Sequence, residues 1–137
     1  MKLRLGFVGG GLNSAGGYKH FAASQMDGLF EVVAGYFSRD AETNMKTGRY
    51  YGVPASRIYS ELALMLSDST GKLAAICILT PTPNHADMVV QCLAAGFNVI
   101  CEKALATSKA ECNAIISAQQ RANRFLGVTF NYAGYPM

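Results

Sequence analysis

A cluster of glycines near the N-terminus has the composition of a phosphate-binding turn. Gly9 and Gly11 flank a further glycine, directly after an apolar segment and before a stretch with helical periodicity. They supply the first two glycines of a G-x-G-x-x-G pattern, in which the first permits a tight bend and the second lets the main chain approach a diphosphate. The amides that open the helix, at Leu12 and Asn13, are expected to face the negative charge.

The third glycine of this pattern is missing from its usual place. Ser14 stands there, unless an insertion displaces the glycine to Ala15, Gly16 or Gly17. Because a lone glycine pattern also occurs in flexible turns that bind nothing, the prediction of nucleotide binding depends on the surrounding elements, a strand before the turn, a helix after it and then a second strand.

A second polar pair, Ser38 and Arg39, follows the next apolar segment. NAD-specific domains place Asp or Glu at this point to bind the ribose 2′-hydroxyl. A hydroxyl beside a guanidinium instead suits a 2′-phosphate, because Arg donates two hydrogen bonds to it and no carboxylate repels it. The pair favours NADP over NAD. The alternative is a surface arginine followed by Asp40 as a helix N-cap.

The segments that carry these residues alternate between strand and helix patterns. Residues 73–79 form a continuous apolar run, which is typical of a strand buried on both faces. This alternation predicts right-handed crossovers and an α/β fold with a doubly wound, mostly parallel sheet, the Rossmann fold. Strands are predicted over residues 3–8, 30–37, 57–59, 73–79, 98–101 and 125–130, and helices over 18–26, 41–51, 61–66, 82–96 and from Ser108 onward.

Three of the predicted helices contain residues that mark a helix end or an apolar face expected to be buried. Thr82 is expected to cap the helix that Gly96 ends, and Ser108 and Glu111 match a capping box. The apolar faces expected to pack in the core consist of Tyr18, Phe21, Ala22 and Met26 in the first helix, and of Cys112, Ile115 and Ile116 in the last.

The composition fits one globular domain, since half of the residues are hydrophobic and 15% are charged. The net charge of +3 comes from scattered Lys and Arg residues, which gives no reason to expect a nucleic-acid partner.

There is no signal-peptide layout and no membrane-length segment, so a cytoplasmic protein is expected. The four cysteines, which contain no C-x-x-C pair and are expected to be buried and reduced, are Cys77, Cys92, Cys101 and Cys112. The two histidines, His20 and His85, are not at ligand spacing from a cysteine, so no metal site is expected.

Taken together, four segments resemble the N-terminal domain of the Gfo/Idh/MocA oxidoreductases, the glucose-fructose oxidoreductase and inositol dehydrogenase family, and the resemblance covers essentially all 137 residues. The most specific is the Glu-Lys pair, because the family carries Glu-Lys-Pro there. This chain has Ala104 where the family's proline would stiffen the turn. The segments are Gly9-Gly10-Gly11, Phe37-Ser38-Arg39-Asp40, Thr80-Pro81-Thr82-Pro83-Asn84-His85 and Cys101-Glu102-Lys103-Ala104-Leu105-Ala106-Thr107.

The resemblance implies roles for several residues at strand ends. Thr80 and Pro81 stand where the family passes its backbone along the cofactor, and His85 matches a family histidine, with a structural role at a helix start more expected than a role as a base. Lys103 inherits a catalytic place near the nicotinamide, where an ammonium group stabilises negative charge on a substrate oxygen. The alternative is a solvated surface lysine. Glu102 would orient that lysine or contact the cofactor ribose, unless it is simply a strand-end carboxylate.

The resemblance also implies a second domain. Residues 1–131 would form the NAD(P)-binding domain, with Asn131 as a cofactor contact, and residues 132–137 would start the crossover to a substrate domain absent from this chain. The implied reaction is hydride transfer between the nicotinamide and a sugar, cyclic polyol or similar secondary alcohol, in a full-length homo-oligomer. The alternatives are a non-catalytic NAD(P)-binding sensor and a domain that binds S-adenosylmethionine or a nucleotide sugar.

Overall fold

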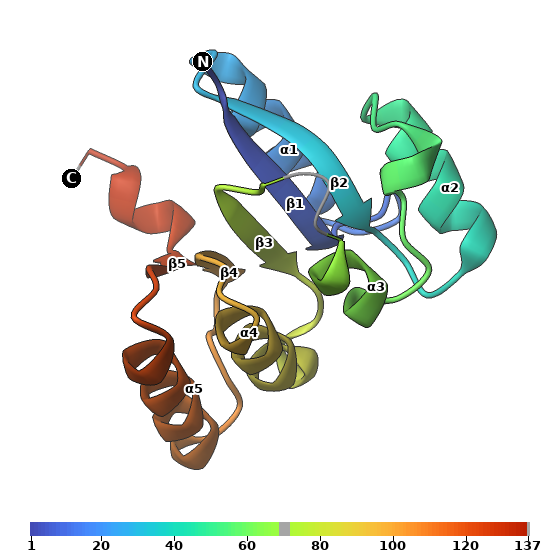
Figure 1. Cartoon of the computed structure of the whole chain (residues 1–137). Helices are drawn as coiled ribbons and strands as arrows, with labels where there is room; N and C mark the ends of the chain where they lie inside the picture. The colour runs from blue at the N-terminus through green and yellow to red at the C-terminus, as the bar shows by residue number, and fades with distance from the viewer. Residues whose placement is uncertain (69–71, 137) are drawn as a thin grey trace.

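The computed structural model of the protein describes residues 1–68 and 72–136. At its centre lies a five-stranded sheet with the order β2-β1-β3-β4-β5, in which every neighbouring pair of strands is parallel (Figure 1). The predicted doubly wound parallel sheet is confirmed. The strands are β1 (Leu3–Gly9), β2 (Phe30–Tyr36), β3 (Ala75–Leu79), β4 (Val99–Glu102) and β5 (Leu126–Thr129).

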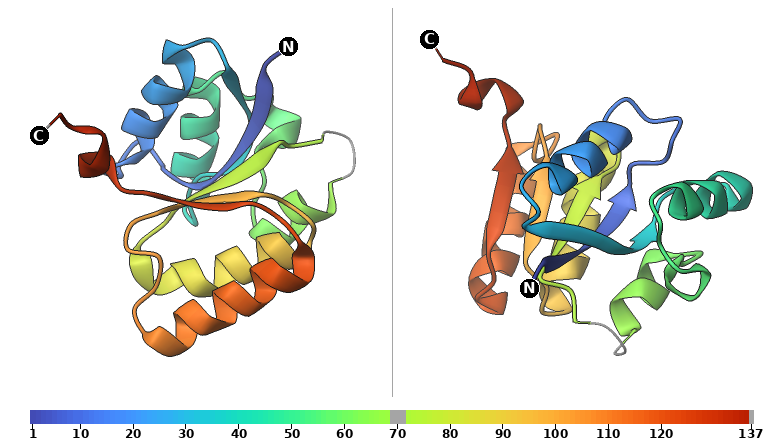
Figure 2. Two further views of the ribbon diagram at one scale, coloured as in Figure 1. Left: turned by 90° about the vertical axis from the view of Figure 1, so that its left-hand side faces the viewer. Right: turned by 90° about the horizontal axis from the view of Figure 1, so that it is seen from above.

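Helices cover both faces of the sheet. Helices α1 and α2 lie on one face, and α3, α4 and α5 lie on the other (Figure 2). Short 3₁₀ segments cover Ala55–Arg57, Thr82–Asn84 and Asn131–Gly134. The α-helices of the described residues are α1 (Gly17–Met26), α2 (Ala41–Tyr50), α3 (Leu62–Ser67), α4 (His85–Ala94) and α5 (Lys109–Ala122).

Strand β3 is the centre of the core and is buried along its whole length. Successive side chains of a strand point to opposite faces. Ile76 and Ile78 therefore pack in the cluster under α3, α4 and α5, while Cys77 and Leu79 pack in the cluster under α1 and α2. The continuous apolar run in the sequence reflects this burial on both faces.

Three of the four cysteines are buried, as predicted, and Cys112 is only partly buried. Burial raises the pKa of the thiols of Cys77, Cys92 and Cys101 to about 12. These thiols are therefore protonated at neutral pH and act as small apolar side chains in the core.

The order of the strands reverses between β1 and β3. From β1 the chain moves outward to β2, whereas from β3 it moves in the opposite direction to β4 and β5. The connections leave the carboxyl ends of β1 and β3 in opposite directions, which opens a crevice between them, the usual place for a ligand in such sheets.

The prediction of a strand over residues 57–59 is wrong. Ala55–Arg57 forms a 3₁₀ turn, and only Ile58 makes a β-bridge, parallel to Gly35. The reason lies in the backbone amides, because the N–H of Arg57 donates to Pro54 O and that of Ile58 to Ala55 O. With these bonds inside the turn, only the Tyr59 N–H reaches β2, where it donates to Gly35 O at 2.9 Å, and the pairing does not extend into a ladder.

Thr82 does not cap its helix with its side chain, so that prediction is wrong. The chain instead enters α4 through a 3₁₀ turn containing Pro83 and closed by the Asn84 N–H on Pro81 O, which takes up amide groups that a cap would otherwise satisfy. The Ser108 cap is confirmed, since its Oγ accepts from the Glu111 N–H at 3.1 Å.

The apolar faces predicted for the first and last helices are confirmed only in part. Phe21 and Ala22 are half-buried and Ile115 is fully buried. Three other members are largely exposed, because α1 packs on the sheet through small residues such as Gly17 and because α5 turns only a narrow stripe to the core. The exposed members are Tyr18 at 54%, Met26 at 81% and Ile116 at 48%.

Within residues 1–68 and 72–136, no helix is both long and apolar enough to cross a membrane. No group of three or more His, Cys, Asp or Glu side chains gathers there in an arrangement that could hold a metal ion.

Candidate cofactor-binding site

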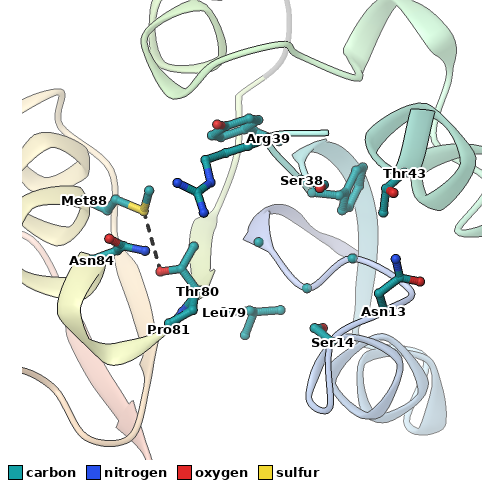
Figure 3. Close-up of a pocket in the computed structure, with 15 residues that line it drawn as sticks. Asn13, Ser14, Ser38, Arg39, Thr43, Leu79, Thr80, Pro81, Asn84 and Met88 are labelled. Atoms are coloured by element: carbon teal, nitrogen blue, oxygen red, sulfur yellow. Dashed lines mark hydrogen bonds between the residues drawn. The ribbon is translucent and has the colours of Figure 1, made fainter. Parts of the chain in front are cut away.

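Two adjoining cavities lie along the carboxyl ends of the strands. The first, of about 290 Å³, lies over the ends of β1 and β2, and the second, of about 670 Å³, lies over the ends of β4 and β5. They share Ser14, Leu79, Thr80 and Pro81, so they form one continuous crevice. Figure 3 shows the first cavity between the glycine turn and the Thr80 loop.

The glycine turn follows β1 with two residues in a conformation that favours glycine. Gly9 and Gly10 have φ values of +78° and +74°. A Cβ atom built on Gly17 would lie 2.0 Å from Gly10 O, so this position tolerates no side chain at all. Gly17 is therefore the third glycine of the fingerprint, displaced by a three-residue insertion, and it allows α1 to pack closely against the turn.

The loop between these glycines is held by hydrogen bonds within the loop and by one to α2. The N–H of Leu12 donates to Thr47 Oγ1 at 3.1 Å, and that of Gly17 donates to Ser14 Oγ at 3.1 Å. The N–H of Ser14 donates to Gly11 O at 2.8 Å. Leu12 thus faces α2 rather than the cavity, whereas Asn13 is exposed and lines the cavity.

Ser38 and Arg39 line the far wall of the first cavity. Arg39 is exposed, and Figure 3 shows its side chain reaching toward Thr80 and Met88 across the cavity. Asp40 caps α2, where its Oδ1 accepts the N–H of Thr43 at 2.7 Å, and the hydrogen bonds from Thr43 lower the pKa of Asp40. Asp40 itself is not part of the cavity wall.

His85 connects two loops of the crevice through its ring nitrogens. It is buried, with its Nε2 2.7 Å from Thr80 O and its Nδ1 2.7 Å from Ala104 O. It lines neither cavity. The histidine therefore positions the two loops that do line the crevice, and its place in the structure is that of a structural residue.

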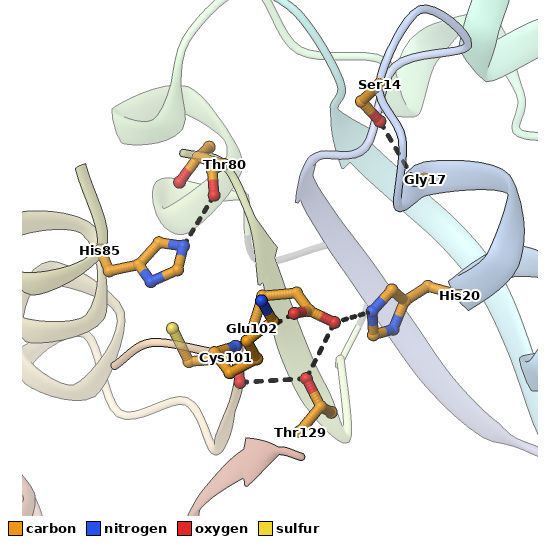
Figure 4. A network of polar contacts seen from close by, with 9 residues as sticks. Ser14, Gly17, His20, Thr80, His85, Cys101, Glu102 and Thr129 are labelled. Atoms are coloured by element: carbon orange, nitrogen blue, oxygen red, sulfur yellow. Dashed lines mark hydrogen bonds and ion pairs between the residues drawn. The ribbon is translucent and has the colours of Figure 1, made fainter. Parts of the chain in front are cut away.

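A hydrogen-bond network occupies the floor of the second cavity, as Figure 4 shows. Glu102 Oε1 lies 2.5 Å from His20 Nε2 and accepts from Thr129 Oγ1 at 3.1 Å. Glu102 Oε2 accepts the Lys103 N–H at 3.0 Å. Partial burial acts to raise the pKa of Glu102, but these hydrogen bonds outweigh it and hold the pKa below its ordinary value.

Lys103 stands at the rim of the second cavity, with an exposed side chain. The peptide bond between Lys103 and Ala104 is cis. Asn131 lines the same cavity from the segment after β5.

The crevice gathers all but two of the residues predicted for the site. The exceptions are Leu12, which bonds to α2, and His85, which lies beneath the loops. Sequence reasoning missed His20, Thr43, Thr47 and Thr129. Of these, only His20 has a visible signal, since it lies three residues after Gly17 and so on the first turn of the helix that the fingerprint opens.

Comparisons with known proteins agree with this geometry. The family model of the Gfo/Idh/MocA oxidoreductases, described as an NAD-binding Rossmann fold, matches residues 3–130. The chain is 34% identical to the uncharacterized oxidoreductase YfiI of Bacillus subtilis, over 98% of this chain and 35% of that protein. It is 30% identical to a trans-1,2-dihydrobenzene-1,2-diol dehydrogenase of Xenopus laevis, over 85% of this chain and 34% of that protein.

Solved structures give the same result. An inositol dehydrogenase homologue from Azotobacter vinelandii, complexed with NADH and myo-inositol, superposes with a TM-score of 0.91 at 33% identity, covering 98% of this chain and 36% of that one. The chain therefore spans about a third of the length of the relatives it matches. With the fingerprint, the strand order and the crevice already described, these matches show that the chain belongs to the Gfo/Idh/MocA oxidoreductase family and forms its NAD-binding Rossmann domain.

Proposed function

We propose that this chain binds NADP or NAD across the two cavities, as the cofactor domain of an oxidoreductase that acts on a secondary alcohol of a sugar or cyclic polyol. The observation that carries the proposal is the continuity of the two cavities through Thr80 and Pro81. One extended ligand can lie with its adenosine half against the glycine turn and its nicotinamide half against Lys103.

The glycine turn fits a diphosphate. Three amides of the loop, those of Leu12, Ser14 and Gly17, already have acceptors. The amides of residues 13, 15 and 16 have no acceptor in the described part of the chain. These groups, next to the N-terminus of α1, are the donors that a diphosphate would use.

The end of β2 favours NADP over NAD in this proposal. The cavity wall there holds the hydroxyl of Ser38, the guanidinium of Arg39 and the side chain of Thr43, with no carboxylate among its residues. The relative from Azotobacter vinelandii was solved with NADH, so the preference for NADP proposed for this chain rests on these side chains and not on that relative.

Lys103 is the proposed catalytic residue at the nicotinamide end. The nicotinamide supplies hydride exchange at its C4 atom. The exposed ammonium of Lys103 would donate a hydrogen bond to the substrate hydroxyl and stabilise negative charge on its oxygen, with Glu102 orienting the lysine through its main chain. In this proposal residues 132–137, the last of which lies outside the described residues, begin the crossover to a substrate domain of a homo-oligomeric, cytoplasmic protein.

Titration of the purified chain with NADPH, NADH and S-adenosylmethionine tests the cofactor. Nicotinamide fluorescence and the shift in Tm of the protein report binding. We expect saturable binding of both nicotinamide cofactors, tighter for NADPH, and none of S-adenosylmethionine. Absence of nicotinamide binding overturns the proposal, while a preference for NADH overturns only the argument from Ser38 and Arg39.

A non-catalytic NAD(P) sensor is the second candidate function, favoured by Ala104 in place of the family's proline. The two functions differ in the consequence of a Lys103→Met change in a protein that carries this domain together with a substrate domain. An oxidoreductase loses turnover of polyols by at least about a hundredfold, while cofactor affinity stays within about twofold. A sensor shows no turnover before or after the change.

A further inference from the structure

His20 is a polar residue of the crevice to which the proposed function gives no role. It lies on the first turn of α1 and lines the second cavity, where its Nε2 is 2.5 Å from Glu102 Oε1. An ionised carboxylate only accepts hydrogen bonds, so the imidazole N–H is the donor. Both side chains are partly buried, and the separation is that of a short, charge-assisted hydrogen bond.

This hydrogen bond spans the centre of the sheet. Helix α1 follows β1, whereas Glu102 ends β4, and β3 lies between those two strands. The bond therefore crosses the carboxyl end of β3, where Leu79 and Thr80 line both cavities. It connects the helix after the glycine turn to the strand that carries Lys103, although its two residues are 82 positions apart.

Glu102 passes the contact on to the main chain of Lys103. Its Oε2 accepts the Lys103 N–H at 3.0 Å, while its Oε1 accepts from Thr129 Oγ1 at 3.1 Å as well as from His20. A carboxylate with partners on both oxygens is restrained in its orientation. The position of the Lys103 amide therefore depends on the bond that His20 makes.

The residue after Lys103 is restrained from the other side of the turn. Ala104 O lies 2.7 Å from Nδ1 of His85, the first residue of α4. Figure 4 shows His20 and His85 on opposite sides of Glu102. Ala104 stands where a proline would fix the backbone of this turn. In its place, contacts with histidines of two different helices restrain the residues on either side of Lys103.

We propose that His20 is a positioning residue, which acts through Glu102 to hold the main chain of Lys103 in place within the second cavity. The inference rests on the proposed function, in which Lys103 donates a hydrogen bond to the substrate hydroxyl. A displacement of about 1 Å can lower the rate of such a step about a hundredfold, so the turn must be restrained before the substrate arrives. The role needs only the N–H at Nε2.

The test measures the NMR order parameter of the Lys103 N–H in the purified chain without cofactor. In the wild type it should be about 0.85, the value of rigid backbone, and in His20→Ala it should fall below about 0.6. His20→Gln keeps an amide donor near the position of Nε2 and should restore most of the loss. A flexible Lys103 in the wild type, or an unchanged order parameter in His20→Ala, overturns the inference.

A double variant tests whether His20 acts through Glu102. Glu102→Ala should lower the order parameter of Lys103 as His20→Ala does, because each change breaks the same chain of hydrogen bonds. Adding His20→Ala to Glu102→Ala should then lower it no further. A further loss in the double variant overturns the inference.

Ser24→Ala is the matched control for a general loosening of α1. The Ser24 hydroxyl donates to Phe21 O at 2.6 Å inside the helix, so its loss affects α1 without touching Glu102. The order parameter of Lys103 should stay at its wild-type value in this variant. In His20→Ala, the amide of Asn13 in the glycine turn should likewise keep its wild-type order. If Asn13 and Lys103 lose order together, His20 only supports the helix and the inference is overturned.

These measurements contain no cofactor, so they separate the inference from the proposed function. Failure of the wild type to bind NADH or NADPH overturns the proposed function and with it the catalytic meaning of the His20 contact. Cofactor binding together with an unchanged order parameter in His20→Ala overturns the inference alone.

Discussion

The two halves of the crevice are built in different ways. The half over β1 and β2 is shaped by close backbone packing, with Gly17 against Gly10 and the Tyr51 hydroxyl donating to Gly10 O at 3.1 Å. Tyr51 also stacks on Phe21 with ring centroids 4.3 Å apart. The half over β4 and β5 is larger and is lined by charged side chains, two of which, Lys19 and Lys103, are exposed.

In the proposed function, this difference corresponds to the two ends of the cofactor. A diphosphate needs rigid main-chain amides, which a packed glycine turn provides within one domain. Hydride transfer needs a side chain that stabilises the charge developing on the substrate oxygen. The relatives are about three times as long as this chain.

The largest effect should come from a steric clash at Gly17, in the half of the crevice over β1 and β2. A Cβ in Gly17→Ala would lie 2.0 Å from Gly10 O and 2.5 Å from its carbonyl carbon, so the turn and α1 must separate. We expect a loss of ~3 kcal/mol in the free energy of unfolding and loss of cofactor binding, measured by urea denaturation and fluorescence titration.

The adjacent glycine gives a matched control for this change. A Cβ at Gly16 meets only the His20 ring carbon at 4.0 Å, and its φ of −101° suits any residue. Gly16→Ala should therefore change the unfolding free energy by less than about 0.5 kcal/mol. Equal losses in the two variants would show that the turn is not packed as described.

A smaller effect should come from loosening the same half without a clash. Thr47 is fully buried, and its Oγ1 accepts the Leu12 N–H at 3.1 Å. Thr47→Val keeps the shape of the side chain but leaves that amide without an acceptor, which costs ~1.5 kcal/mol of unfolding free energy. Thr47→Ser keeps the hydroxyl and should lose less. If both variants unfold at the same urea concentration, the hydrogen bond contributes nothing.

A change at Arg39 tests whether side chains also determine the cofactor preference in the half of the crevice over β1 and β2. Arg39→Asp removes a cation from the cavity wall and adds an anion that repels a 2′-phosphate. The preference for NADPH over NADH should fall by about tenfold or more, which corresponds to ~1.4 kcal/mol. The ratio of the two Kd values measures this effect. An unchanged ratio would return Arg39 to the role of a surface residue.

Most of the fold could be predicted from the sequence because its signals are local. The apolar run of β3, the glycine turn and the Ser108 cap each depend on a few consecutive residues. The strand near Ile58 could not be excluded, because its failure depends on amides that a 3₁₀ turn takes up. The exposure of Tyr18 depends on where α1 lies on the sheet, which periodicity does not specify.

The residues of the candidate site show the same contrast between local signals and contacts that only the folded chain makes. Gly9 and Gly11 could be identified because a steric rule demands glycine after the first strand. The choice of Gly17 as the third glycine required the backbone distance to Gly10. The His20 contact with Glu102 joins residues 82 positions apart, and no pattern in the sequence connects them.

The smallest effect concerns the acid stability of the charged half. The pKa of Glu102 is held below its unfolded value of 4.5, so the ionised carboxylate stabilises the fold above that pH and loses this contribution as the pH falls through the folded pKa. The wild type should therefore lose more unfolding free energy than Glu102→Gln between about pH 6 and about pH 3, by up to ~1 kcal/mol. Asp40 and Glu111 also have lowered pKa values, but both proteins contain them, so their contribution cancels in the comparison. Parallel curves of unfolding free energy against pH would show that the network around Glu102 adds no stability. The half of the crevice over β4 and β5 would then contribute charge alone.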